Sequence, residues 1–291
     1  MERLLQLTNV MREARRRLYR LKRKLLYPSS RDRLLFQLRF GRRNRLTIDT
    51  GKTSFQINTR SFTAKAHFYP LHARGGLYEA AVVRILEERC KPRSCFLDIG
   101  ANVGFFTLLA AKLCYPGAVH AFELDPELVQ EVYQNALLNQ LENVYVVSGA
   151  VWETDGRFFC FSSYGNNKTM NILNNMSLTT SIWIPSLKID SYCELQGINP
   201  SVIKIDVEGA EARVLSGMSD VLKGTETILV EVHPEMLPVF GDGLDKVIAP
   251  LQRAGFRLSI VRNHRGQDTP TFVPLSQAGP ISQNCMLLGE R

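Results

Sequence analysis

The feature that most constrains this chain of 291 residues is a regular alternation of short apolar runs with helical patterns between residues 95 and 288. The apolar runs have the length of buried strands and lie at residues 95–99, 118–123, 144–148, 202–206, 227–232, 257–261 and 285–288. Helical patterns fall between several of them, at residues 105–113, 126–139, 211–222 and 243–254. Strands that alternate with helices form a mostly parallel sheet with helices on both faces. We therefore predict an α/β, Rossmann-like fold with a doubly wound, seven-stranded sheet.

Smaller elements precede and interrupt this alternation. The runs RLTID and SFQIN are separated by Thr50-Gly51-Lys52 and predict a hairpin, and residues 78–89 predict a helix. An inserted strand pair is expected near residues 158–162 and 181–185. The polar stretch at residues 164–180, rich in Asn and Ser, lies in this insertion. It either recognises an acceptor molecule or serves as a plain connection.

Positive charge is concentrated at the N-terminus. Residues 1–45 hold 15 Lys or Arg against 3 Asp or Glu, whereas the remainder holds 21 against 25. An apolar stripe at helical spacing in this arm comprises Leu4, Leu7, Met11, Ala14, Leu18, Leu21 and Leu25. Such a helix binds an anionic membrane surface or an acidic partner, packs on its own domain, or self-associates. We predict a basic arm (1–45) and a mildly acidic main domain (46–291, core about 78–291), and no nucleic-acid partner.

Cysteine usage indicates the compartment. The six cysteines are scattered without a CxxC pair or a nearby histidine cluster, which predicts reduced thiols. No apolar run reaches the length of a membrane span, and the N-terminus is too basic for a signal peptide. We therefore expect a cytoplasmic protein whose only membrane contact is peripheral, so the glycosylation sequons at Asn167 and Asn175 carry little weight. The sequence leaves the oligomeric state open.

A glycine turn follows the first strand of the core in the segment FLDIGANVGFF, residues 96–106. Gly100 lets the backbone approach a ligand closely, and Gly104 lets the turn lead directly into a helix. The next strand ends at Glu123, about 20 residues further on, where a carboxylate accepts hydrogen bonds from the hydroxyls of a ribose. The pattern predicts a nucleoside-containing cofactor.

The charge of the turn selects among such cofactors. The turn is not GxGxxG, and Asp98 stands where a dinucleotide enzyme presents helix amides to a pyrophosphate. A carboxylate there repels a pyrophosphate but attracts the amino group and sulfonium of S-adenosylmethionine. The residues thus favour S-adenosylmethionine over NAD.

Five segments resemble, in order and approximate spacing, the FkbM family of methyltransferases: DIGANVGFFT, AFELDP, SLKIDSY, IKIDVEGAEARVLSG and ILVEVHPEM. The resemblance covers residues 78–288 and implies a class I methyltransferase fold, S-adenosylmethionine as methyl donor, and a hydroxyl acceptor on a sugar, glycolipid, polyketide or related metabolite. It assigns the methionine part and its loop to Asp98, Gly100, Asn102 and Gly104. It assigns the ribose to Glu123 and the neighbourhood of the adenine to Ala150.

The acceptor is expected at the carboxyl ends of the fourth and fifth strands, where ligands bind in open α/β sheets. IKIDVEGAE places Asp206 and Glu208 there, and Lys204 shares a strand face with Asp206, so the two are expected to form an ion pair. His233 follows the fifth strand and is the histidine placed to act as a general base. We predict Asp206, His233 and Glu208 as catalytic residues.

Two alternatives stay open at this point. Asp206, Glu208 and Glu231 have the oxygen ligands that Mg²⁺ takes, so a metal replacing base catalysis is possible, although none is assigned. The second alternative concerns the function: the chain binds S-adenosylmethionine without catalysis, or it methylates a protein, lipid or RNA.

Overall fold

The structure of the chain is a computed structural model that describes residues 44–59, 68, 71, 75–164, 167–171, 182–266 and 269–291. For residues 161–164 and 167–171 it describes the backbone alone. The predicted basic helix lies outside the described residues, as does most of the polar stretch at 164–180, so the membrane contact and the acceptor loop stay predictions. In the described part of the chain, no helix has the length and apolar character needed to cross a membrane.

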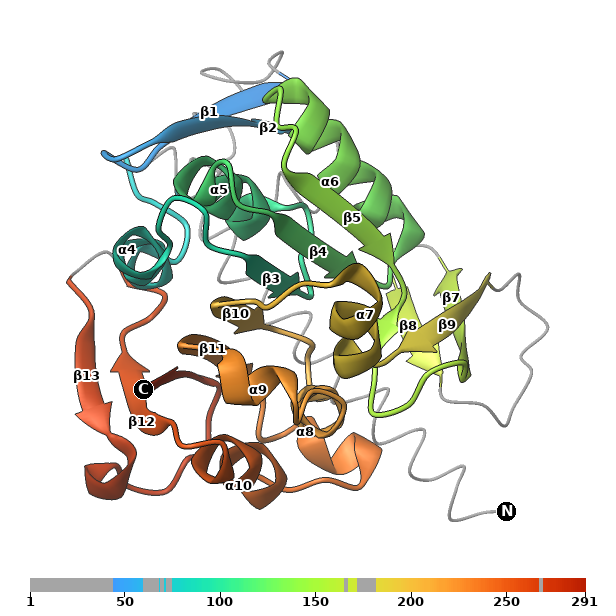
Figure 1. The fold of residues 1–291 in the computed structure, drawn as a ribbon, viewed down its shortest axis with the longest axis vertical. Coiled ribbons are helices and arrows are strands. Elements are labelled where there is room, and N and C mark those ends of the chain that lie inside the picture. The colour runs from blue at the N-terminus through green and yellow to red at the C-terminus, as the bar shows by residue number, and fades with distance from the viewer. Residues whose placement is uncertain are drawn as a thin grey trace. The chain divides into compact units, whose positions relative to one another are not determined.

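An eight-stranded sheet forms the centre of the main domain, in the order β13-β12-β14-β11-β10-β3-β4-β5 (Figure 1). Its strands are β3 (Phe96–Ile99), β4 (Val119–Glu123), β5 (Val144–Ser148), β10 (Val202–Ile205), β11 (Thr227–Val232), β12 (Arg257–Arg262), β13 (Thr271–Pro274) and β14 (Cys285–Glu290). From β5 to β11 the neighbours are parallel, and β14 is antiparallel to both β11 and β12. The predicted Rossmann-like class I methyltransferase fold is confirmed.

The eighth strand is a difference from the prediction. β13 is antiparallel to β12 at the edge of the sheet, and most of its residues are exposed. It has four residues and ends at Pro274, so it carries neither the buried apolar run nor the length that marks the other strands. The seven predicted strands are present with shifts of one or two residues at their ends.

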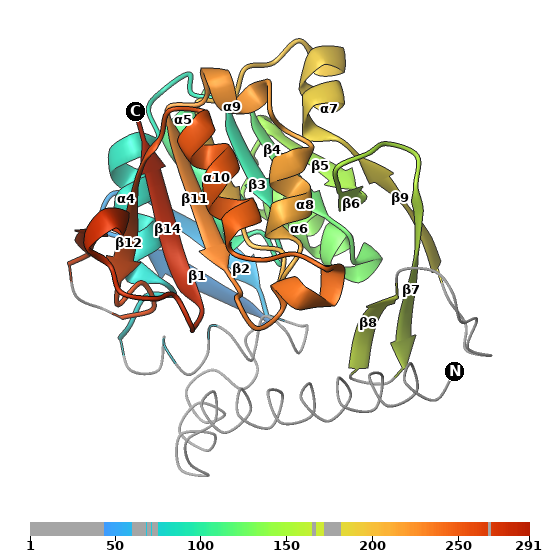
Figure 2. The same cartoon turned by 90° about the horizontal axis from the view of Figure 1, so that it is seen from below.

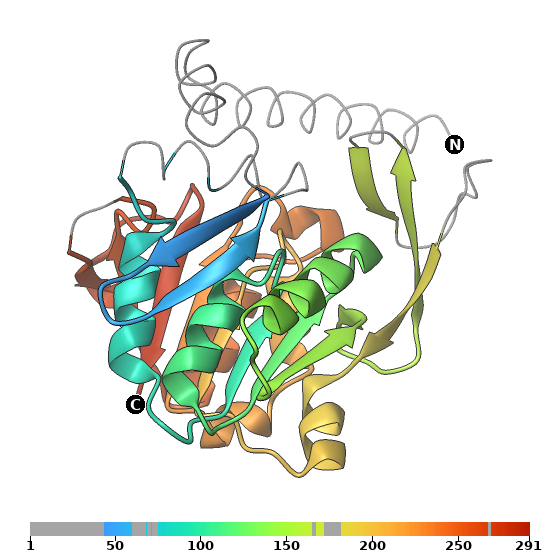
Figure 3. The same cartoon turned by 90° about the horizontal axis from the view of Figure 1, so that it is seen from above.

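Helices cover both faces of this sheet (Figures 2 and 3). One face carries α4 (Ala80–Arg89), α5 (Phe105–Cys114) and α6 (Pro126–Leu138). The other carries α7 (Ile189–Gln196), α8 (Glu211–Ser216), α9 (Val221–Gly224) and α10 (Asp245–Arg253). Short 3₁₀ turns lie at η1 (Leu237–Phe240) and η2 (Leu275–Gln277). The buried faces of the strands and helices form the apolar core.

The predicted helix at residues 211–222 is divided into α8 and α9. Gly217 lies so close to the backbone of Trp152 that a Cβ there would be 2.3 Å from the Trp152 carbonyl oxygen. Asp190 then accepts hydrogen bonds from the backbone N–H groups of Asp220 and Val221 and starts a new helix. The interruption arises from contacts distant in sequence, which helical periodicity does not reveal.

The insertion and the N-terminal hairpin contain the other strands. The predicted pair is present as β7 (Phe158–Tyr164) and β9 (Ile182–Leu187), which are antiparallel. It extends to a four-stranded sheet, β6-β9-β7-β8, with β6 (Ala150–Val151) and β8 (Asn167–Asn171). The predicted hairpin is present as β1 (Arg45–Asp49) and β2 (Ser54–Asn58).

Candidate functional site

A cavity of about 240 Å³ lies beyond the carboxyl ends of β3, β4 and β10. Its polar wall contains Asn102, Glu123, Asp206 and Glu208, with Gly100 and Gly149 between them. The remaining wall is mostly apolar and consists of Ile99, Phe122, Leu124, Leu128, Ala150, Val151, Trp152, Val207 and Ala210. The structure therefore brings six residues predicted for the site, Gly100, Asn102, Glu123, Ala150, Asp206 and Glu208, around one cavity.

Gly100 is the residue at which the turn after β3 approaches the backbone of Asp206. Its φ of +84° is left-handed, and a Cβ would lie 2.0 Å from the backbone oxygen of Asp206. The backbone N–H groups of Gly100 and Ala101 both donate to the Phe122 oxygen, which fixes the turn against β4. Gly104 also has a positive φ, but it packs on Val132 of α6 and does not line the cavity. The structure thus gives Gly104 a packing role.

Glu123 is held by backbone hydrogen bonds. Its Oε2 accepts from the N–H of Asn102 at 2.8 Å, and its Oε1 accepts from the N–H groups of Leu124 and Asp125 at 2.8 and 2.9 Å. Burial raises the pKa of Glu123 to about 7, although these hydrogen bonds act in the opposite direction. Because a carboxylate oxygen accepts more than one hydrogen bond, Oε2 retains capacity for a ligand in the cavity.

Two buried polar atoms of the cavity wall have no hydrogen-bond partner among the described residues. They are Oδ1 of Asn102 and Nε1 of Trp152. Asn102 also has a left-handed backbone with a φ of +54°, a strained conformation for a residue with a side chain. An unsatisfied buried polar group costs about 1–3 kcal/mol, so both atoms favour a polar ligand in the cavity.

Asp98 is not among the described residues that line the cavity, and its contact with the methionine part stays a prediction. Its carboxylate is buried in the sheet, where Oδ2 accepts a hydrogen bond from Thr107 Oγ1 at 2.6 Å. Burial raises the pKa of Asp98, and the positive charge of Lys204 on the adjacent strand partly offsets this. The register pairs Asp98 with Lys204 of β10, so both side chains project from the same face of the sheet, and Thr107 belongs to α5 on that face.

The predicted ion pair between Lys204 and Asp206 is confirmed, with Nζ and Oδ2 3.3 Å apart. Lys204 is buried, and its Nζ lies 4.9 Å from the centre of the Phe106 ring. Burial acts to lower the pKa of Lys204, but the negative charges of Asp206 and Asp98 outweigh it and raise the pKa. Lys204 is therefore a permanent cation between two carboxylates.

His233 follows β11 and is buried against three glutamates. Its Nδ1 lies 2.8 Å from Glu211 Oε1, while its Nε2 lies 3.8 Å from Glu231 Oε1 and 3.9 Å from Glu208 Oε2. Burial acts to lower the pKa of His233, but the hydrogen bond with Glu211 and the charges of Glu208 and Asp206 outweigh it and raise the pKa to about 9. The role of His233 as a general base stays a prediction.

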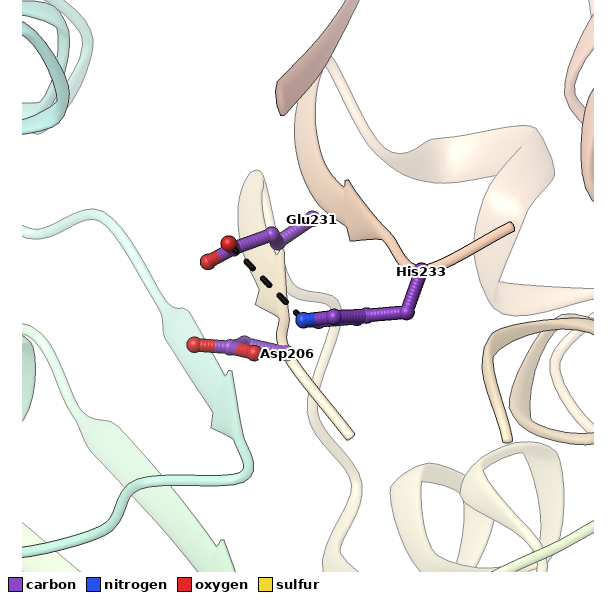
Figure 4. Close-up of side chains that lie close together, drawn as sticks. All are labelled: Asp206, Glu231 and His233. Carbon is purple, nitrogen blue, oxygen red and sulfur yellow. Dashed lines mark ion pairs between the residues drawn. The ribbon is translucent and has the colours of Figure 1, made fainter. Parts of the chain in front are cut away.

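Glu231 and its neighbours complete this group. Arg265 Nη2 contacts Glu231 Oε1, and His264 Nε2 lies 3.7 Å from the same oxygen. Burial acts to raise the pKa of Glu231, but the interactions with His264 and the positive charge of Arg265 outweigh it and lower the pKa. Figure 4 shows the His233 ring directed toward the space between Asp206 and Glu231. One ligand atom from each of these three residues lies within 4.8 Å of the others, so the three have the spacing of metal ligands.

No site role was predicted for Glu211, which contacts His233, or for Trp152, which lines the cavity. Glu211 is buried, and its Oε1 accepts from the Gly209 N–H as well as facing His233, so it ties the turn after β10 to β11. In the sequence it resembles an ordinary acidic residue in the first turn of a helix. Its spacing from Asp206 and Glu208 is a signal only once α8 is placed beside β11.

The comparisons with known proteins identify the family of the chain. Residues 98–258 match the model of the methyltransferase FkbM domain. Hexuronic acid methyltransferase AglP of Haloferax volcanii is 28% identical over 162 residues, which is 55% of this chain and 64% of that protein's length. Ribosomal protein L11 methyltransferase of Bacillus cytotoxicus is 35% identical over 65 residues, 22% of this chain and 20% of that protein.

Among solved structures, methyltransferase FkbM of Methylobacillus flagellatus is 14% identical, with 89% of this chain and 59% of that chain covered and a TM-score of 0.43. Precorrin-6y C5,15-methyltransferase of Geobacter metallireducens is 13% identical, with 73% and 88% covered and a TM-score of 0.40. The strand order of the central sheet defines the fold. The match to the domain model spans more than half of the residues, so the chain belongs to the FkbM family of methyltransferases.

Proposed function

We propose that this chain transfers a methyl group from S-adenosylmethionine to a hydroxyl of a sugar or a related metabolite. The observation that carries the proposal is the cavity at the carboxyl ends of β3, β4 and β10, where the Glu123 carboxylate and two unpaired buried polar atoms face one space. The family supports the methyl transfer. The hexuronic acid named for the Haloferax relative supports a sugar as acceptor.

The residues of the cavity fit S-adenosylmethionine. Glu123 would hold the ribose hydroxyls, Ala150 and the Trp152 indole would contact the adenine, and Gly100 and Asn102 would adjoin the methionine part. When bound, the cofactor supplies a methyl group activated by a positive sulfonium. Because the cavity has no phosphate-binding cation among its described lining residues, it suits this cofactor better than a dinucleotide.

Asp206 and Glu208 would receive the acceptor on the opposite side of the cavity. Burial raises the pKa of Asp206, partly offset by Lys204, so its carboxylate is a stronger base than an ordinary aspartate. We assign to Asp206 the acceptance of the hydroxyl proton and to Lys204, 3.3 Å away, the stabilisation of that carboxylate. Glu208 is about half exposed at its side chain and would bind further hydroxyls of the acceptor.

The experiment that tests this proposal is calorimetric titration of the full chain with S-adenosylhomocysteine. Glu123→Gln should weaken binding at least tenfold, about 1.4 kcal/mol, because an amide cannot replace the charge-assisted hydrogen bonds of a carboxylate. Glu194→Gln, an exposed position on α7, is the matched control and should leave the affinity unchanged. NAD should not compete.

Absence of binding, or equal affinity in the Glu123 and Glu194 variants, would refute this cofactor site. Circular dichroism of both variants establishes that each is folded before the affinities are compared.

A further inference from the structure

The side chains of Asp206, Glu231 and His233 converge from the ends of two neighbouring strands, β10 and β11, onto one small space (Figure 4). We propose that these three residues bind one divalent transition-metal cation of the Mn²⁺ type. The ligands differ from those of the Mg²⁺ alternative raised by the sequence: His233 is a ligand here, and Glu208 is not. It goes beyond the proposed function, since it concerns an ion and not the methyl donor.

The orientation of His233 is the first argument. The side chain is 2% exposed, and its Nδ1 is fixed by Glu211 at 2.8 Å, which leaves Nε2 directed at the other two residues. This Nε2 makes no hydrogen bond to any described residue, since the nearest carboxylate oxygens lie 3.8 and 3.9 Å away. Histidines that bind metals commonly donate their other N–H to a carboxylate, which sets the tautomer and the direction of the ring. Glu211 has this position.

The spacing is the second argument. The three ligand atoms lie within 4.8 Å of one another, and His233 Nε2 and Glu231 Oε1 are 3.8 Å apart. Ligand atoms on opposite sides of a cation with bonds of about 2.0–2.4 Å are roughly 4.0–4.8 Å apart, and adjacent ligand atoms are closer. One ion therefore fits among the three residues after small rotations of their side chains.

Charge is the third argument. Five carboxylates, those of Asp98, Asp206, Glu208, Glu211 and Glu231, surround the Lys204 and His233 side chains and all but that of Glu208 are mostly buried. Among the described residues, the permanent cations that contact these carboxylates are Lys204 and Arg265. Buried carboxylates need compensating charge, and a divalent ion supplies two positive charges at the point where they converge.

Arg265 is a competitor for this position. It contacts the Glu231 carboxylate, and its side chain is 53% exposed. Displacement of an exposed arginine costs little compared with the gain from direct coordination. Removal of Arg265 should thus favour the ion.

The ligand set indicates the kind of cation. Two carboxylates suit Mg²⁺, Ca²⁺ and Mn²⁺, whereas an imidazole suits transition metals, so the mixed set favours Mn²⁺ over Mg²⁺ or Ca²⁺. Asp206 also lines the cavity, so the ion would lie beside the acceptor side proposed above. A cation there would lower the pKa of a coordinated hydroxyl, a consequence that rests on the proposed function.

The test is titration of the chelator-treated full chain with Mn²⁺. Binding is measured as the loss of the electron paramagnetic resonance signal of free Mn²⁺. We expect one bound ion per chain. Asp206→Asn, Glu231→Gln and His233→Ala should each weaken binding at least tenfold, and Glu211→Gln should weaken it about tenfold through loss of the imidazole orientation. Arg265→Gln should bind Mn²⁺ as tightly as the unmodified chain or more tightly.

Asp220→Asn is the matched control, because Asp220 is an exposed carboxylate that pairs with Lys223 and not with any of the three ligands. Mn²⁺ affinity equal in Asp220→Asn and in the three ligand variants would overturn the proposal, as would absence of stoichiometric binding. Circular dichroism of the same samples shows that each variant is folded. S-adenosylhomocysteine affinity is measured separately without Mn²⁺, so failure of the metal site and failure of the proposed cofactor site are distinguishable.

Discussion

Glu123 and Asp206 line the same cavity from the ends of β4 and β10, but their charges are compensated in different ways. Three backbone N–H groups donate hydrogen bonds to the Glu123 carboxylate, and no cation is among the groups that shift its pKa most. Side chains hold Asp206, with Lys204 at 3.3 Å and His233 beside it. The first arrangement depends on the path of a turn, whereas the second depends on residues from several elements.

The difference separates what each side of the cavity can do. Backbone donors stay in place when a ligand arrives, so Glu123 offers a preorganised acceptor for hydrogen bonds. The side chains around Asp206 can exchange partners, since Arg265 is exposed and His233 Nε2 makes no hydrogen bond to the described residues. We therefore expect the Glu123 side to bind and the Asp206 side to carry out proton or metal chemistry.

The largest expected effect comes from removing the cation between the two buried carboxylates. Lys204→Met should lower the free energy of unfolding by about 3–5 kcal/mol, because Asp98 and Asp206 would remain buried without their partner. Urea unfolding at pH 7.5 measures the change. Lys112→Met, at an exposed position near the end of α5, is the matched control and should cost less than about 1 kcal/mol.

A double variant sharpens this prediction. Lys204→Met with Asp206→Asn should recover at least about 1 kcal/mol, since one of the unpaired charges is removed. Equal costs for Lys204→Met and Lys112→Met would show that the side-chain arrangement around Asp206 does not depend on Lys204.

The next effect separates chemistry from binding. Asp206→Asn should keep the affinity for S-adenosylhomocysteine within about twofold and reduce methyl transfer by roughly 100-fold, about 2.7 kcal/mol, as expected for loss of a positioned base. Methyl transfer is measured as S-adenosylhomocysteine formed with hexuronic-acid-containing sugars as acceptors. A tenfold loss of S-adenosylhomocysteine affinity with unchanged turnover would reverse the roles given to the two sides.

The two sides also differ in how far the sequence predicts them. Glu123 is predictable because its spacing from the glycine turn follows from a strand, a turn and a helix adjacent in the chain. The contact between Glu211 and His233 is not, because it requires α8 to lie beside β11, and α8 itself ends early where Gly217 meets Trp152. Local sequence patterns thus predict the Glu123 side of the cavity better than the Asp206 side.

Asp98 and β13 show the same limit at the level of single strands. Asp98 lies one residue before the end of β3, and only the pairing with Lys204 reveals that its carboxylate shares a face of the sheet with that cation. β13 is held by pairing with β12 at an exposed edge, so its own residues carry little apolar signal. Both outcomes depend on a neighbouring strand distant in sequence.

The smallest expected effect is the pH dependence that Glu123 gives to stability and to ligand affinity. Burial raises the pKa of Glu123 from its ordinary value of 4.5 to about 7, so the native state holds an extra proton between these values. The stability that this proton contributes is present below about pH 4.5 and is lost as the pH rises through 7.

Ionised Glu123 accepts stronger hydrogen bonds, so S-adenosylhomocysteine affinity should instead rise about fivefold between pH 6 and 8. Thermal unfolding with and without the ligand measures both trends, and subtracting the pH profile of Glu123→Gln removes the contribution of other groups. Identical pH profiles for the two proteins would mean that Glu123 does not titrate in this window and that the turn stabilises its charge more strongly than burial opposes it.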